Sequence, residues 1–306
     1  MYDSSDPRST LASAADRPAP TQFAGAECGK FYETAPQEDD ANGRTWFIRS
    51  QNCVVAYTEA RDGAHFVRSA QPDEYVLLLP EAGVSAEILT PDGRIAVAGY
   101  SIAFVPPGAS EIRISGAGPV VRLLTARAED LAAKCVNAAA YRTPQPNIAP
   151  FAPWPDAAAG RRVHAYSLDV PDEPGRFGRI WRGSTLMVNF LPPQSGPRDV
   201  TKLSPHHHDD FEQISLALEG AFTHHLRWPW TTNLNNWRDD LHEYCAAPSA
   251  MVIPPPAIHT SRGMLEGINQ LVDIFCPPRR DFSLKPGWVL NHTDYPMPSE
   301  SSNAAA

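Results

Sequence analysis

A histidine-rich run between Ser204 and Glu212 constrains this chain more than any other segment. It contains the pattern H-x-H-x-x-x-E, from His206 through His208 to Glu212, and His259 follows a proline run further along. Side chains two positions apart on a β-strand point to the same face, so His206 and His208 can converge on one point. Glu212 and His259 can complete the group, and three imidazoles with one carboxylate suit a divalent transition metal. The sequence therefore predicts a metal site.

The residues after this run predict a strand. Apolar and polar residues alternate up to a glycine turn at Gly220, which is the period of a half-buried strand. Glu212 shares the phase of the apolar positions Ile214, Leu216 and Leu218. We therefore expect Glu212 to point inward, where a buried carboxylate is costly unless a cation pairs with it. A bound metal would meet that need.

Two separated motifs resemble the cupin superfamily. The first is the H-x-H-x-x-x-E run followed by Gly220, and the second runs from Ile253 through the prolines to His259. The resemblance implies a small antiparallel β-barrel whose interior metal is held by His206, His208, Glu212 and His259. Departures exist: the closing Gly220 comes one residue late, and the usual glycines and asparagine are replaced at Val200, Pro256 and Gly263.

A simpler interpretation of the three consecutive histidines is a solvated polar loop. The spacing to Glu212 and the position of His259 behind strand-end prolines favour the metal site instead. His207 is out of phase with its neighbours, so we expect it at the surface or behind the ligands rather than on the metal.

A weaker copy of the same pattern lies upstream. Aligning Glu74 with Glu212 places Arg68, Ala70 and Glu111 where the three histidines stand, so this copy lacks a metal site and Arg68 is expected to pair with Glu74 or Glu111. The alternative is that the similarity reflects only common strand-and-turn composition. Duplication predicts an all-β bicupin with two antiparallel barrels and little helix. We expect an N-terminal tail at 1–22, a metal-free barrel at 23–143, a proline-rich linker at 144–160, a metal-binding barrel at 161–298 and a C-terminal tail at 299–306.

The metal-bearing copy has a longer segment between its motifs, rich in tryptophan, arginine and histidine. Long loops in compact domains are often functional, and aromatic and guanidinium groups suit a flat or acidic ligand. Packing of the loop onto the barrel or a second subunit explains the tryptophans equally well. On the functional interpretation the catalytic candidates are His224, Arg227 and Arg238, and the substrate-binding candidates are Trp228, Trp230, Trp237 and Arg262.

Charge and composition limit the classes of partner that this chain is expected to bind. The net charge is −9 and basic residues are not clustered, which argues against phosphate-backbone binding, and no apolar run is long enough to span a membrane. Five scattered cysteines and an N-terminal segment without an apolar signal region favour reduced thiols and a cytoplasmic location. By analogy with cupins, we expect a homodimer.

The chemistry stays open at this stage. Three histidines and one carboxylate would leave positions for substrate on a metal, for which Fe(II) is favoured and Mn, Ni, Zn or Cu is admissible. Our leading hypothesis is a non-haem Fe(II) dioxygenase that uses O₂ on a small aromatic or enolisable organic acid. The alternatives are a redox-neutral isomerase, lyase or decarboxylase of a hydroxy- or keto-acid, and a non-catalytic ligand-binding cupin.

Overall fold

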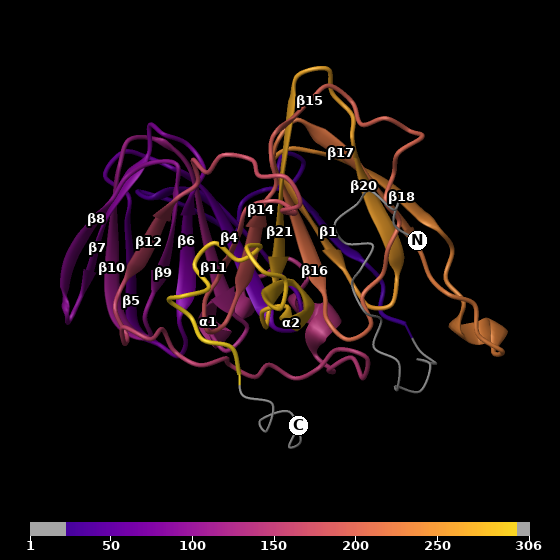
Figure 1. Ribbon diagram of the computed structural model, residues 1–306, viewed down its shortest axis with the longest axis horizontal. Helices are drawn as coiled ribbons and strands as arrows, with labels where there is room; N and C mark the ends of the chain where they lie inside the picture. Colours follow the sequence, from indigo (N-terminus) through magenta and orange to yellow (C-terminus); the bar gives the residue numbers. More distant parts are fainter. Residues whose placement is uncertain (1–22, 299–306) are drawn as a thin grey trace.

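The computed structural model describes residues 23–298, so both predicted tails lie outside the described residues. The chain forms two antiparallel β-barrels side by side, with the N-terminal half in indigo to magenta and the C-terminal half in orange to yellow (Figure 1). This confirms the all-β, two-barrel prediction. After the first barrel the chain forms a four-residue helical turn, α1 (Glu129–Ala132), and a 3₁₀ turn, η2 (Ala138–Tyr141).

Each barrel pairs a large sheet with a smaller one. The large N-terminal sheet has the order β12 (His164–Ser167), β9 (Ser101–Val105), β6 (Tyr75–Leu79), β11 (Gly118–Thr125), β4 (Cys53–Ala60), β3 (Gly43–Arg49) and β2 (Glu38–Asp40). The smaller sheet is β5 (His65–Gln71), β10 (Gly108–Ser115), β7 (Ser85–Thr90) and β8 (Gly93–Val97).

The C-terminal half repeats this plan. Its large sheet has the order β1 (Glu27–Lys30), β19 (Ser249–Ile253), β16 (Gln213–Glu219), β21 (Ile268–Phe275), β14 (Met187–Phe190) and β13 (Ile180–Arg182), with β15 (Gln194–Ser195) beside β21. The smaller sheet is β18 (Leu241–Ala246), β17 (Ala221–Arg227) and β20 (Ile258–Gly263). The short turns η3 (Leu234–Asn236) and α2 (Arg280–Ser283) complete the elements, and no helix among residues 23–298 has the length and apolar character to cross a bilayer.

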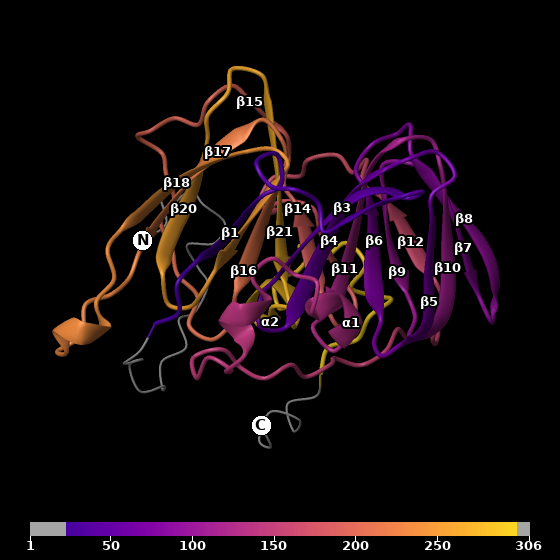
Figure 2. The same cartoon turned by 180° about the vertical axis from the view of Figure 1, so that it is seen from behind.

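The halves exchange strands. β1, from the start of the chain, adds to the C-terminal sheet beside β19, and β12, from beyond the proline-rich segment, adds to the N-terminal sheet beside β9. Figure 2 shows β1 among the strands of the other half. The hydrogen-bonded sheets therefore do not follow the expected division of the chain at 144–160.

The largest apolar cluster lies between the two large sheets. It combines Val55, Leu78 and Phe104 from one half with Val188, Ile214 and Leu216 from the other. A second cluster, including Phe66, Leu77 and Ile112, fills the N-terminal barrel. Alternation along β16 therefore turns Ile214 and Leu216 toward the other barrel and turns Gln213 and Ser215 into its own interior. The β16–β17 turn needs Gly220, because its φ is +81° and a Cβ there would lie 2.5 Å from the Ile268 carbonyl oxygen.

Candidate metal centre

Three histidines converge inside the C-terminal barrel. His259 lies on β20, and His206 pairs with it across an isolated antiparallel bridge, with N–H···O distances of 3.0 and 2.7 Å in the two directions. His208 follows on the same short extended segment. One ring nitrogen from each histidine lies within 4.8 Å of the other two. The structure thus brings together three of the four predicted ligands.

Hydrogen bonds orient two of the rings. His206 Nδ1 lies 2.9 Å from the Ser204 carbonyl oxygen, and His259 Nδ1 lies 2.9 Å from that of Ala257. A carbonyl oxygen only accepts, so each Nδ1 carries the proton and each Nε2 keeps its lone pair. Backbone orientation of this kind is what metal-binding histidines use to present the other nitrogen.

His208 is held as a neutral imidazole. Burial lowers its pKa well below the usual value, and the charges of Arg279, His259 and His206 act in the same direction. Its ring stacks on Phe211 at 4.5 Å between centroids. Neutral imidazole is the form that binds a metal, so this environment suits a ligand.

Gln213 occupies the position beside the histidines. Its amide nitrogen donates to Ser215 Oγ at 2.9 Å and to Asp273 Oδ1 at 3.0 Å, so its amide oxygen accepts from His208 Nε2–H at 3.0 Å. A metal at His208 Nε2 would require the tautomer with the proton on Nδ1. Ser215 Oγ also donates to Asp273 Oδ1. The group next to the cluster is therefore a neutral oxygen donor, and the nearest carboxylate in this network is one residue further away.

Glu212, the fourth predicted ligand, does not join the histidines, and the prediction is corrected here. Its carboxylate accepts from the Gln51 backbone N–H at 2.6 Å and from the Tyr141 hydroxyl at 2.8 Å, both in the N-terminal half. Burial raises its pKa to about 7, partly offset by these hydrogen bonds. The reason is the phase of β16: the apolar face that Glu212 shares is buried between the barrels rather than inside one.

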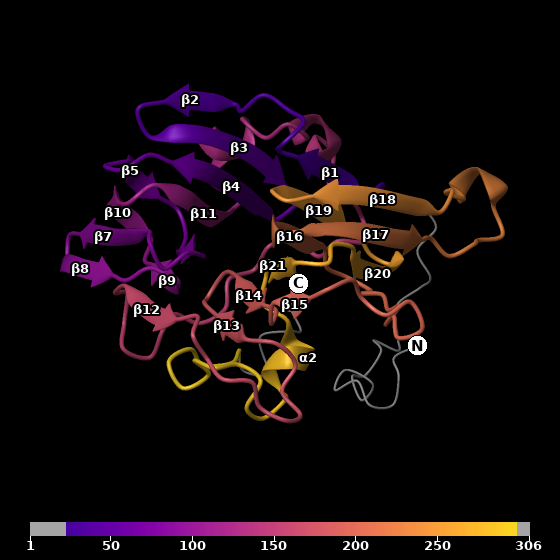
Figure 3. The same ribbon diagram turned by 90° about the horizontal axis from the view of Figure 1, so that it is seen from above.

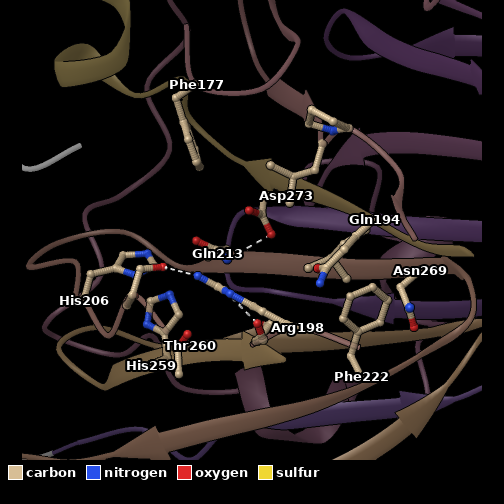
Figure 4. Close-up of a pocket in the computed structure, with 15 residues that line it drawn as sticks. Phe177, Gln194, Arg198, His206, Gln213, Phe222, His259, Thr260, Asn269 and Asp273 are labelled. Carbon is tan, nitrogen blue, oxygen red and sulfur yellow. Dashed lines mark hydrogen bonds between the residues drawn. The ribbon is translucent and has the colours of Figure 1, made fainter. Parts of the chain in front are cut away.

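A cavity of about 240 Å³ opens beside His206 and His259 (Figure 4). Its polar lining includes Gln194, Arg198, Ser204, Gln213, Thr260, Asn269 and Asp273, and its apolar lining includes Phe177, Leu191, Phe222 and Leu271. Arg198 is anchored by donating to the Ser261 carbonyl oxygen and to Ser204 Oγ, both at 3.0 Å. The cavity thus combines two of the three clustered histidines with one guanidinium and one carboxylate.

The predicted catalytic residues lie elsewhere. Among the described residues that line the cavity, His224, Arg227 and Arg238 are absent. His224 is buried behind the wall, with Nδ1 2.8 Å from Ser261 Oγ, and burial lowers its pKa to about 3. Arg227 is exposed and binds Asp240, while Arg238 donates to the Phe23 carbonyl oxygen at 2.7 Å.

The predicted substrate-binding residues are likewise outside the described cavity lining. Trp228 is buried in a small apolar cluster and donates to the Ala24 carbonyl oxygen. Trp230 and Trp237 stack on each other at 4.4 Å on the loop that carries η3, which extends away from the barrel between β17 and β18 (Figure 3). Arg262, on β20, pairs with Thr223 of β17, and its charge adds to the effects of burial and of His242 that lower the pKa of His225.

In the N-terminal barrel the corresponding positions hold no such cluster. Arg68 pairs with Asp130 and bonds Gln71, rather than Glu74 or Glu111. Glu111 is a partner of His65 and Arg113 at the surface. Glu74 accepts from the Ser184 backbone N–H at 2.7 Å and from the Tyr295 hydroxyl at 2.9 Å. Glu74 and Glu212 therefore play the same part, each bonded to a turn and a tyrosine of the opposite half.

Comparison with solved structures identifies proteins that share this fold. The oxalate decarboxylase of Lactobacillus farciminis, in a formate complex, superposes with a TM-score of 0.53 over 85% of this chain and 89% of that chain, at 11% identity. The oxalate decarboxylase of Bacillus subtilis at pH 4.6 gives a TM-score of 0.51 over 85% of this chain and 79% of that chain, also at 11% identity. The chain therefore has the two-barrel bicupin fold of these structures. No family model matches the sequence, and no curated protein matches it.

Proposed function

We propose that the C-terminal barrel binds one divalent transition metal through His206, His208 and His259, with the Gln213 amide oxygen as a neutral fourth donor. The convergence of the three rings carries this proposal. Two of the rings are oriented by backbone carbonyls, and the third is kept neutral by burial. Imidazole nitrogen is a ligand for iron, nickel, copper and zinc alike, so the donor set fits the ion without selecting it.

The charge of the cluster favours an anionic substrate. Every proposed donor is neutral, and Asp273 is separated from the histidines by the Gln213 amide. A divalent ion held there keeps its full positive charge, because no protein carboxylate in the group neutralises it. Such an ion would polarise substrate oxygens and, as Fe(II), would supply one-electron chemistry with O₂.

The cavity favours a small organic acid. Its volume of about 240 Å³ is below the range of drug-sized pockets. Arg198 can pair with a carboxylate of the substrate, because a guanidinium offers several donors in one plane. Phe222 and Leu271 add an apolar surface to the lining that suits an aromatic or short alkyl portion of the substrate.

Asp273 is the proposed proton acceptor. It lines the cavity, and its Oδ1 is fixed by Gln213 and Ser215. A fixed carboxylate at this place can take a proton from a hydroxyl or an enolisable carbon of the bound acid. Thr260 and Gln194 would orient the substrate through hydrogen bonds.

We further propose that the reaction is an O₂-dependent cleavage with Fe(II). Three or four protein donors leave positions for a substrate and for O₂, as in non-haem iron sites with open positions. A redox-neutral decarboxylation is the second candidate. It is supported by the names of both structural neighbours, and one of those structures holds formate.

One experiment separates these candidates. The full-length protein, loaded separately with Fe(II) and Mn(II), is incubated with a panel of small hydroxy-, keto- and aromatic acids, with and without O₂. We expect turnover with Fe(II) that consumes O₂ and stops under anaerobic conditions. Metal-dependent turnover that continues without O₂ would establish the decarboxylase-type alternative.

The control is His259→Ala, which should lack activity under every condition. If metal and an acid both bind and no product forms with any acid, a non-catalytic ligand-binding cupin replaces the enzymatic proposal. Absence of metal binding in the wild-type protein would exclude the O₂-dependent cleavage, the decarboxylation and metal-dependent binding of an acid without catalysis.

A further inference from the structure

A pair of cysteines joins the exchanged strand β1 to the C-terminal barrel. Cys28 lies on β1 and Cys245 on β18, and their sulfur atoms are 3.3 Å apart although the residues are 217 positions apart in sequence. The other three cysteines are buried elsewhere, at Cys53, Cys135 and Cys276. The contact lies outside the metal centre and has no part in the proposed reaction.

The two thiols differ in environment. Cys28 is exposed and Cys245 is buried. The hydrogen-bond contact with Cys245 lowers the pKa of Cys28; burial and the Glu243 carboxylate act against this shift, and the ammonium of Lys30 acts with it. The same contact, with burial, raises the pKa of Cys245. An accessible thiol with lowered pKa beside a second thiol is the arrangement found in redox-sensitive cysteines.

A metal is the competing occupant, because Glu243 lies with both cysteines in one group of potential ligands. The Glu243 carboxylate, however, is bonded to Lys30 Nζ at 2.7 Å. A divalent cation would have to displace that ammonium or lie beside it. The ion pair therefore favours covalent chemistry between the sulfurs over a metal site.

We propose that Cys28 and Cys245 form a dithiol that a hydroperoxide converts into a disulfide. The Cys28 thiolate attacks the hydroperoxide: an S–O bond forms, the O–O bond breaks, and the departing oxygen leaves as water or alcohol after taking a proton. Cys245 then attacks the Cys28 sulfur: the S–S bond forms, the S–O bond breaks, and hydroxide leaves as water with the Cys245 proton. The two thiols together lose two electrons, and the hydroperoxide gains them.

The bond would fasten the first strand of the chain. β1 pairs with β19, which pairs in turn with β16, the strand that carries Gln213. In the reduced protein, β1 is held by its ladder and by the ion pair to Glu243. In the oxidised protein, it would also be tied covalently to the sheet on the other side of the barrel.

The test uses the full-length protein purified with reductant and then treated with one equivalent of hydrogen peroxide. We expect the count of free thiols in the denatured protein to fall by two, and a Cys28–Cys245 linked peptide to appear in a non-reducing digest. Addition of dithiothreitol to the digest should separate the linked peptide into its two component peptides. Lys30→Met should slow the reaction several-fold without changing the product.

Two serine variants provide the matched controls. Cys135→Ser, at a buried thiol with raised pKa, should form the linked peptide as the wild type does. Cys245→Ser should form none and should accumulate sulfenic or sulfinic acid at Cys28. The proposal is overturned if Cys28 over-oxidises with Cys245 intact, or if the purified protein carries one zinc ion that Cys245→Ser removes.

Discussion

The interiors of the two barrels differ although their strands follow one plan. The N-terminal barrel is filled mainly by apolar side chains such as Phe66, Ile88 and Ile112, with the guanidinium of Arg122 buried over Phe66. The C-terminal barrel has apolar clusters around Leu226 and around Phe222, with the histidines, Gln213 and Asp273 among its inward-facing residues. One barrel is built as a core and the other as a site.

What the barrels share is equally informative. Glu74 and Glu212 stand at matching positions, and each accepts hydrogen bonds from a backbone N–H and a tyrosine of the opposite half. These glutamates join the halves. The difference in function therefore lies in the inward-facing positions, and the resemblance lies in the interface.

The largest expected effect comes from removing a ligand in the C-terminal barrel. His259→Ala should lower metal affinity by more than about 100-fold, since even partners of a ligand contribute roughly 10- to 100-fold. Elemental analysis and calorimetric metal titration measure this. Glu111→Ala, at the matching N-terminal position, is the control and should bind metal as the wild type does. Equal losses in both variants would refute the contrast between the barrels.

Asp273→Asn tests the chemistry of the polar interior. Asparagine keeps an oxygen that can accept from Gln213 and Ser215 but cannot take a proton. We expect kcat to fall roughly 100- to 10,000-fold, the range for loss of a general acid–base group, with metal content unchanged. Unaltered kcat would leave Asp273 as a structural residue only.

The pH dependence of stability tests the interface. The pKa of Glu212 rises from 4.5 to about 7 in the folded protein because of burial. At this carboxyl the folded state then binds more protons than the unfolded state between these values, so the contribution of Glu212 to stability is greatest below pH 4.5 and falls as pH rises toward 7. The loss from this group is about 3 kcal/mol, and burial raises the pKa of Glu74 in the same direction.

Urea unfolding from pH 4.5 to 7 measures this contribution as the difference between the wild type and Glu212→Gln, because buried His208 and His224, whose pKa values are lowered, change stability in the opposite direction in both proteins. Glu212→Gln should flatten the profile, because glutamine does not ionise. A profile unchanged by this substitution would show that another group carries the dependence.

A smaller effect should be common to both halves. Glu74→Ala and Glu212→Ala each leave a buried backbone N–H and a tyrosine hydroxyl without their acceptor, at roughly 1–3 kcal/mol per group. We expect similar losses of stability and unchanged metal content in both variants. Gln213→Ala is the contrasting variant and should weaken metal binding. A Glu212→Ala protein that cannot bind metal would restore Glu212 as a ligand.

The smallest effect is expected on the exposed loop. Trp230→Ala and Trp237→Ala remove side chains that stack on each other away from the cavity. KM for the substrate should change by less than about twofold, within the usual range for surface substitutions. Steady-state kinetics measure this. A large rise in KM would indicate that Trp230 and Trp237 contact the substrate.

The sequence was sufficient for the fold and for the histidines. The resemblance of the two motifs to cupins predicts the two barrels, and the strand alternation with the spacing of the motifs predicts the grouping of His206, His208 and His259. Glu212 was misplaced because a strand with one apolar face was assumed to turn that face into its own barrel. The late Gly220 was the available signal: counting back from it by the usual spacing leads to Gln213 instead.

Other features had no local signature. Asp273 lies in the apolar strand β21, and Arg198 lies in an irregular segment, so neither reveals that it lines a cavity. The Trp and Arg loop is unusual in composition, but its direction depends on how β17 and β18 twist. Contacts of this kind arise only when distant segments meet.

The exchange of β1 and β12 determines what would happen if the chain were divided between its two halves. A fragment ending within the proline-rich segment would lack the strand that borders β9, and the complementary fragment would lack the one that borders β19. Each would present a bare sheet edge, which invites aggregation. Division of the chain in the proline-rich segment would therefore take an edge strand from each half, so each half depends on the other for its complete sheet.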